Sequence, residues 1–250
     1  MEAIIREKLK EIEKKEQVEI ILAVESGSRA WGFESPDSDY DVRFIYIRKP
    51  EYYLRLDETK DVIEWQLDET LDINGWDLQK ALRLLYKSNS TLLEWCTSPI
   101  VYYQTEKIEI LKKILVNYFS GKKNLYHYWH MASTNYNQFL QGKDVKIKKY
   151  FYTLRPLLAG KWVIDRNTFP PMRFNELVAA ELDDSMLPYV QELLEKKANL
   201  DELDYVPRID KLNDYIAKNL LTLEVKAQML FDEKNSWEEL NKVFLELVLN

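Results

Sequence analysis

The sequence predicts an α/β domain followed by a helical domain, and three observations support this. The first hundred residues alternate between amphipathic helical patterns and short apolar runs typical of strands. Beyond Pro99 nearly every apolar pattern has helical spacing. Of the 250 residues 46% are hydrophobic and only 6 are glycine and 8 proline, which excludes a low-complexity or collagen-like chain. We therefore expect two domains, at residues 1–118 and 119–250.

The first elements are a helix and two strands. Apolar residues recur at helical spacing over residues 2–15, and a β-branched run over 18–24 predicts a buried strand. Residues 31–39 have the Gly, Ser, Pro and Asp content of a loop. A second strand is expected over 40–47, because the apolar run stops before Pro50.

Two further short strands and then helices complete the chain. Strands over 61–67 and 70–73 are expected to form a hairpin through the polar pair Asp68-Glu69. Asp77 immediately precedes a helical pattern, where it can cap the helix or act as its first-turn acid. The later helices are expected over residues 106–119, 124–140, 147–164, 174–182, 187–197, 209–231 and 237–249.

Composition excludes several classes of site. The single cysteine, Cys96, cannot form an internal disulfide, and His127 and His130 alone provide almost no material for a zinc site or a Ser-His-Asp triad. A divalent metal is therefore expected to be held by carboxylates. The N-terminus alternates charged and apolar residues, and no apolar run reaches the roughly 18 residues of a membrane span. These features predict a cytoplasmic protein without a membrane partner.

The stretch from Gly27 to Arg43 carries the residues suited to chemistry. Strand side chains point to the same face every second residue, so Asp39 and Asp41 can share divalent cations. Arg43 continues that face and is expected to contact the nucleotide, a role compatible with a salt bridge to either acid. Gly27 and Ser28 follow the first strand, where a glycine allows close approach and the backbone N–H groups of a turn can cradle phosphate oxygens. If the first two strands are neighbours, phosphate and metal sites meet, as nucleotidyl transfer requires.

A third carboxylate would complete such a site. We favour Asp72, which alternates with apolar residues in a short strand, because a strand fixes a ligand more rigidly than a helix start. Asp77 is the alternative, although it already has a structural role as a helix cap. Asp61 and Asp68 are weaker candidates. Arg29 is either a phosphate or base contact or an exposed loop charge, and Trp31 either anchors its loop or caps a base.

These motifs resemble the active-site signature of the DNA polymerase β-type nucleotidyltransferase superfamily. More narrowly, they resemble the YcgL-like nucleotidyltransferases associated with RNA repair. The similarity extends to about residue 175. The segments that carry it are Gly27-Ser28-Arg29-Ala30-Trp31-Gly32, Ser35-Pro36-Asp37-Ser38-Asp39-Tyr40-Asp41-Val42-Arg43, Leu71-Asp72-Ile73-Asn74-Gly75-Trp76-Asp77-Leu78, Glu94-Trp95, Ser98-Pro99, Lys148-Lys149-Tyr150-Phe151-Tyr152, Leu154-Arg155-Pro156-Leu157-Leu158-Ala159 and Pro170-Pro171-Met172.

The resemblance implies a small mixed sheet with flanking helices, followed by the helical domain. It also implies an NTP as donor and Mg²⁺ or Mn²⁺ as cofactor. Gly27 and Ser28 would bind phosphate, and Asp39, Asp41 and Asp72 would be metal ligands and catalytic residues.

Charge is distributed unevenly along the chain. Residues 121–161 contain eight basic residues and one acidic residue, a net charge of +7, whereas the other residues contain 27 basic and 41 acidic ones, a net charge of −14. Aromatic residues are interleaved with these charges, which favours a polyanion site for triphosphate or RNA over a solvated helix face. Within it, Lys149 and Arg155 are expected to contact nucleotide or phosphate.

The sequence thus predicts a Mg²⁺-dependent enzyme that moves a nucleoside monophosphate from an NTP to a hydroxyl and releases pyrophosphate. The preferred acceptor is an RNA 3′ end, as in RNA repair or processing. The alternatives are the same chemistry on a small molecule or a protein side chain, and a catalytically silent nucleotide- or RNA-binding module. Base preference and oligomeric state stay open.

Overall fold

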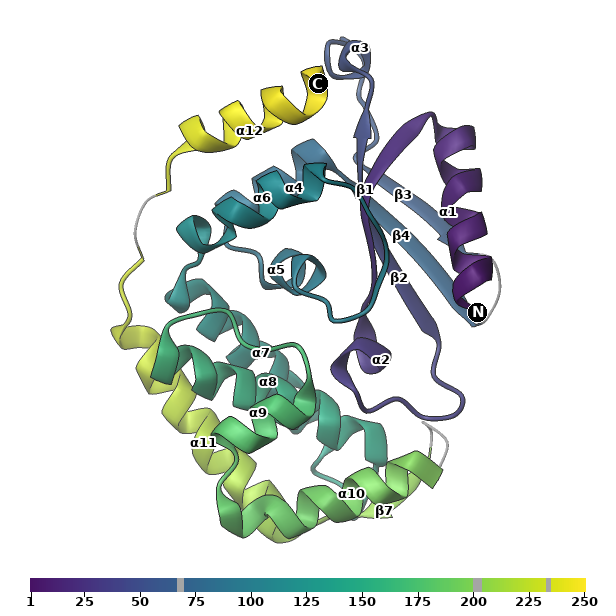
Figure 1. Cartoon of the computed structure of the whole chain (residues 1–250). Coiled ribbons are helices and arrows are strands. Elements are labelled where there is room, and N and C mark those ends of the chain that lie inside the picture. The colour runs from purple at the N-terminus through teal and green to yellow at the C-terminus, as the bar shows by residue number, and fades with distance from the viewer. Residues whose placement is uncertain (67–69, 200–203, 233–234) are drawn as a thin grey trace. The chain divides into compact units, whose positions relative to one another are not determined.

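The computed structural model describes residues 1–66, 70–199, 204–232 and 235–250 (Figure 1). These residues divide into two compact units, each with its own core. The sheet unit comprises the described residues of 1–30, 39–118 and 234–250, and the helical unit comprises those of 31–38 and 119–233. Each unit is described here separately.

The sheet unit is built on a five-stranded mixed sheet in the order β3-β4-β2-β1-β5. Strands β2 and β4 run parallel, and every other neighbouring pair is antiparallel. The strands are β1 (Val18–Glu25), β2 (Tyr40–Arg48), β3 (Val62–Gln66), β4 (Leu71–Asp77) and β5 (Val101–Gln104). The antiparallel pairing of β3 with β4 agrees with the expected hairpin, whose Asp68-Glu69 connection lies outside the described residues.

Helices cover both faces of this sheet. Figure 1 shows α1 on one face and α4, α5 and α6 on the other. Because both faces are covered, β1 and β2 are nearly continuous apolar runs and do not alternate between apolar and polar residues. The helices are α1 (Glu2–Glu16), α2 (Gly27–Trp31), α3 (Pro50–Tyr53), α4 (Leu78–Tyr86), α5 (Ser90–Cys96), α6 (Lys107–Ile114), a 3₁₀ turn (Leu115–Tyr118) and α12 (Trp237–Leu249).

The helical unit packs around α7 (Gly121–Phe139) and α8 (Ile147–Arg166), with α9 (Phe174–Glu181), a 3₁₀ turn (Asp184–Met186), α10 (Leu187–Asn199) and α11 (Asp210–Met229). An entirely helical second part was expected, but β6 (Asp144–Lys146) and β7 (Tyr205–Pro207) form a two-stranded sheet. Each strand has a single buried residue, Val145 or Val206, which is too little for an alternating pattern to register in the sequence.

The loop between α2 and β2 belongs to the helical unit. Phe33 is buried in its core and stacks on Phe151, with ring centroids 5.1 Å apart. Trp31 packs edge-on against Tyr152 at 5.6 Å and lies under the guanidinium of Arg155 at 4.4 Å. Of the two roles considered for Trp31, these contacts make it an anchor of its loop.

Helices α7 to α12 correspond to the helices expected from periodicity, to within a few residues at their ends. The expected turn at Gly27-Ser28 is wrong in detail, because these residues form the first turn of α2. Helices α3 and α5 and strand β5 were not predicted; each is only four to seven residues long, too short for a clear period. No helix in the described part of the chain is both long and apolar enough to cross a membrane.

Gly75 on β4 provides a test of the parallel pair at the centre of the sheet. A Cβ at this position would lie 2.2 Å from the ring of Phe44, its register partner on β2. We expect Gly75→Ala to lower the free energy of unfolding by about 1–3 kcal/mol through overpacking. Denaturant unfolding of Gly75→Ala, Phe44→Leu and the double variant measures this. The double variant should recover part of the loss, and strict additivity would contradict the explanation.

Candidate active site

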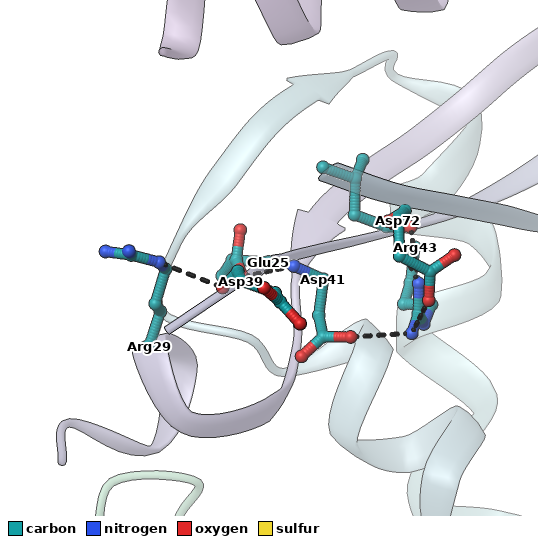
Figure 2. Close-up of polar contacts among 7 residues, drawn as sticks. Glu25, Arg29, Asp39, Asp41, Arg43 and Asp72 are labelled. Atoms are coloured by element: carbon teal, nitrogen blue, oxygen red, sulfur yellow. Dashed lines mark hydrogen bonds and ion pairs between the residues drawn. The ribbon is translucent and has the colours of Figure 1, made fainter. Parts of the chain in front are cut away.

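The centre of the candidate site is a bridge between two strands. Asp41 on β2 and Asp72 on β4 are direct partners in the parallel register. One guanidinium nitrogen of Arg43, Nη2, lies 2.8 Å from Asp41 Oδ1 and 2.8 Å from Asp72 Oδ2, as Figure 2 shows. Its other terminal nitrogen, Nη1, donates to the backbone carbonyls of Val42 and Asp72, both at 3.1 Å. The guanidinium thus offsets one of the two negative charges and reduces the repulsion between the two carboxylates.

This bridge is partly open to solvent. The Arg43 side chain is 18% exposed, whereas that of Asp72 is 50% exposed. Asp72 is therefore accessible to a ligand from outside, while Arg43 is held from behind by backbone carbonyls. An exposed carboxylate beside this bridge is suited to binding a cation.

Gly27 lies against the Asp41 carboxylate. Its φ is +62°, and a Cβ built on it would lie 2.2 Å from Asp41 Oδ2. Only glycine combines this left-handed conformation with room for the carboxylate. The next residue, Ser28, is buried. The structure therefore brings the expected phosphate-binding pair and one expected metal ligand into contact.

Asp39 and Arg29 lie at the entrance to β2. Arg29 Nε donates to the backbone carbonyl of Asp39 at 3.0 Å, and its guanidinium lies 3.8 Å from the ring centroid of Tyr40. Asp39 is exposed, and a dashed line in Figure 2 marks its backbone contact with Arg29. Arg29 is therefore a residue that shapes the backbone next to the two aspartates.

Glu25, which the sequence interpretation overlooked, is the last residue of β1 and is completely buried. Its Oε1 accepts a hydrogen bond from the backbone N–H of Asp41 at 2.8 Å, and its Oε2 accepts one from the hydroxyl of Tyr102. Burial raises the pKa of Glu25 to about 7. The available signal was an acid at the end of an apolar strand, two residues before the Gly-Ser pair.

Asp77, the alternative third carboxylate, serves as the N-cap of α4. Its Oδ1 accepts from the backbone N–H of Gln79 at 2.7 Å, and its Oδ2 accepts from the hydroxyl of Tyr53 at 3.0 Å. It stands five residues beyond Asp72 on β4, roughly 16 Å along the strand. Of the weaker candidates, Asp61 pairs with Lys80 at 3.1 Å, and Asp68 lies outside the described residues.

Lys149 and Arg155 lie on α8 in the helical unit. Lys149 Nζ is 3.6 Å from the ring centroid of Phe139, and burial together with the nearby Lys148 and Lys146 lowers its pKa. Arg155 is 2% exposed and donates from Nε to the carbonyl of Met172 at 3.2 Å. Their contacts with nucleotide or phosphate stay predictions.

The side-chain atoms at this site are of the type that binds divalent cations. Carboxylate oxygens are the ligands that Mg²⁺ and Mn²⁺ prefer, and Asp41 and Asp72 present such oxygens around one positive charge, the Arg43 guanidinium. Among the described residues, no group of three or more His, Cys, Asp or Glu side chains is gathered closely enough to hold a metal. Asp39 would have to complete the set.

Comparison with known proteins decides the family. The model of the RlaP family, an RNA repair pathway DNA polymerase beta family, matches residues 1–246. The chain belongs to this family. It is therefore a nucleotidyltransferase of the polymerase β type, and its mixed sheet with flanking helices and a helical part agrees with the fold expected from the sequence.

Two relatives of the RlaP chain are themselves uncharacterised. The protein YcgL of Bacillus subtilis (strain 168) is 45% identical over 250 residues, covering 98% of this chain and 95% of its own length. Protein 062L of Invertebrate iridescent virus 6 is 28% identical over 151 residues, covering 58% and 80%. A crystal structure of a nucleotidyltransferase-like protein from Exiguobacterium sibiricum 255-15 is 18% identical, with a TM-score of 0.32, and covers 97% of this chain and 79% of that chain.

Gly27→Ala tests the contact with Asp41. The new methyl group should displace the carboxylate and weaken Mn²⁺ binding in the presence of ATP by roughly tenfold or more, as measured by electron paramagnetic resonance of free Mn²⁺. Gly32→Ala is the matched control, because its φ is also positive (+80°) but its Cβ would meet only the end of the Arg173 side chain, at 3.5 Å. Both variants should lose about 1–3 kcal/mol of stability to backbone strain. Equal Mn²⁺ affinity in the two variants would contradict the proposed contact.

The raised pKa of Asp77 predicts that the stability of the fold depends on pH. Burial raises its pKa to about 6 from an ordinary value of 3.8. The folded protein then holds the proton to a higher pH than the unfolded chain, so the stability due to this group falls as the pH rises from about 4 to about 6. Asp77→Asn keeps a capping side chain and removes this dependence, so it should gain roughly 2–3 kcal/mol relative to the wild type between pH 4 and pH 7.

Denaturant unfolding at several pH values measures this gain. Asp77→Ala should in addition lose about 1 kcal/mol at every pH, because the cap is removed. A difference between Asp77→Asn and the wild type that does not change with pH would show that Asp77 is not protonated on folding.

Proposed function

We propose that this RlaP protein transfers a nucleoside monophosphate from an NTP to a hydroxyl group and releases pyrophosphate. The observation that supports this most strongly is the pairing of Asp41 and Asp72 across parallel strands, beside the close approach of Gly27. Asp39, Asp41 and Asp72 are the residues we assign to Mg²⁺ or Mn²⁺. Ser28, Arg29 and Arg43 are assigned to the nucleotide together with Gly27.

Each residue has a defined task in this proposal. A bound divalent cation neutralises the triphosphate and lowers the pKa of the attacking hydroxyl. The hydroxyl oxygen forms a bond to the α-phosphorus as the bond from that phosphorus to the bridging oxygen breaks, and pyrophosphate leaves. Asp72 accepts the proton of the attacking hydroxyl, because its half-exposed carboxylate can be reached by the acceptor molecule. Arg43 offsets one of the two negative charges of the paired carboxylates.

An RNA 3′ end is the acceptor we favour. The family description names an RNA repair pathway, and residues 121–161 carry a net charge of +7. Lys149 is proposed as a phosphate contact within that segment, whereas Arg155 is buried against Trp31 and Met172 and is not accessible to an external phosphate. Small-molecule and protein hydroxyls are the other acceptors of the same chemistry.

One observation favours a second candidate function, that of a catalytically silent binding module. Arg43 already supplies a positive charge between Asp41 and Asp72, as expected of a site that binds without turning over. In that case nucleotide or RNA would still bind, but no transfer would occur.

Labelling separates these readings. We expect purified protein with α-labelled NTPs, Mg²⁺ or Mn²⁺ and short RNAs to attach label to RNA 3′ ends. Asp41→Ala should reduce labelling to background, and Asp72→Asn should reduce it roughly 100-fold or more because the proton acceptor is lost. Asp77→Asn is the matched control and should label at the wild-type rate.

Three outcomes would contradict the proposal. Transfer that survives Asp41→Ala would exclude the assigned metal site. Transfer lost in Asp77→Asn but kept in Asp72→Asn would identify Asp77 as the third acid. Binding of nucleotide without label transfer to RNA, small molecules or protein would identify the silent module.

A further inference from the structure

We propose that Glu25 and Tyr102 form a positioning pair that fixes the backbone of Asp41, and with it the ligand geometry of the metal site. This inference rests on the proposed function, because it assigns a role within the same site. Neither residue need touch metal or nucleotide. Their role is to hold Asp41 in the position where its carboxylate can bind the metal.

The end of β1 creates the need for such a pair. The last pairing between the strands joins Glu25 to Val42, and the backbone N–H of Ser26 then donates to the carbonyl of Asp41 at 2.9 Å. In an antiparallel ladder the N–H of Asp41 points to that same side. The chain turns into α2 at Gly27, so no backbone carbonyl of β1 continues the ladder there.

The Glu25 side chain supplies the missing acceptor. Its Oε1 receives the Asp41 N–H at 2.8 Å, at a part-buried position where an unmet N–H would be destabilising. The β1–β2 ladder is thus extended by one side-chain hydrogen bond, at the residue that carries the carboxylate.

Glu25 is itself held from β5 and the segment before it. Tyr102 on β5 donates its hydroxyl to Glu25 Oε2. The backbone N–H of Glu25 donates to the carbonyl of Ile100 at 3.0 Å, and Ser98 Oγ donates to the carbonyl of Glu25 at 2.7 Å. Both carboxylate oxygens and both backbone groups of Glu25 are therefore engaged. A residue held at four points can transmit a fixed position to its neighbour.

The pair also links two parts of the site. Glu25 precedes Gly27 by two residues, and Gly27 lies against the Asp41 carboxylate. Fixing Glu25 therefore fixes both the backbone behind Asp41 and the turn in front of it. A shift of about 1 Å in either would spoil a ligand geometry that must be accurate to about 0.5 Å.

Substitutions at Glu25 and Tyr102 test this role through Mn²⁺ binding. Glu25→Met keeps the volume but removes both acceptors, and we expect Mn²⁺ affinity in the presence of ATP to fall about tenfold. Glu25→Gln keeps an acceptor for the Asp41 N–H and should stay within about threefold of the wild type. Tyr102→Phe removes only the support behind Glu25 and should fall about threefold. Electron paramagnetic resonance of free Mn²⁺ gives the affinity, and circular dichroism the folded fraction.

Glu13→Met is the matched control. The Glu13 carboxylate also accepts a hydrogen bond from the backbone N–H of a β1 residue, Ile20, at 2.9 Å. Its loss should lower stability and leave Mn²⁺ affinity unchanged. If Glu25→Met does not fold, Tyr102→Phe decides the question.

The outcomes separate this inference from the proposed function. Wild-type Mn²⁺ affinity in folded Glu25→Met, or in Tyr102→Phe where Glu25→Met is unfolded, overturns the positioning role. Equal weakening in Glu25→Met and Glu13→Met also overturns it, since the effect would be one of general stability. If Asp41→Asn itself binds Mn²⁺ like the wild type, the proposed metal site fails and the positioning role fails with it. Weakening in Asp41→Asn and Glu25→Met together, with Glu25→Gln preserved, supports both.

Discussion

The parallel pairing of β2 with β4 is the constraint on which the site depends. It sets Asp41 directly beside Asp72, and the two acids can share this place only because the Arg43 guanidinium lies between them. The other neighbouring strand pairs described in this sheet are antiparallel. The two acids therefore lie side by side where two strands run in the same direction. Arg43 is fixed in turn by the backbone carbonyls of Val42 and Asp72. A sheet register and one ion-pair bridge thereby define where a metal could be held.

Most of the elements follow from local patterns in the sequence, whereas the pairing of Asp41 with Asp72 comes from the parallel register of β2 and β4, which no local pattern shows. Alternation and apolar runs located β1 to β4, and Asp77 was identifiable as a helix cap from its place before an apolar pattern. The contacts of Glu25 were not predictable, because its partners Asp41 and Tyr102 are 16 and 77 residues away and only the strand order brings them together. The Gly27-Ser28 turn was predicted as a turn, but a five-residue helix has no period from which to recognise it.

Charge counted along a sequence differs from charge presented on a surface. Several members of the basic segment are engaged within the helical unit. Arg155 is buried against Trp31, Lys161 pairs with Asp183 at 3.0 Å, and Lys123 pairs with Asp232 at 3.1 Å. Lys143 is exposed and Lys146, Lys148 and Lys149 are partly exposed, and all four lie near the start of α8. Any ligand of this segment should therefore be sought at that end of the helix.

The loop that carries Trp31 and Phe33 means that neither unit is a continuous stretch of chain. The chain leaves the sheet unit after residue 30, returns at 39, leaves again after 118 and returns once more for α12. A fragment that begins at residue 119 would therefore lack Phe33, which is buried in the core of the helical unit. A fragment that ends at residue 118 would carry Trp31 and Phe33 without the aromatic side chains they pack against. Expressing either unit from a single continuous segment thus leaves a core incomplete.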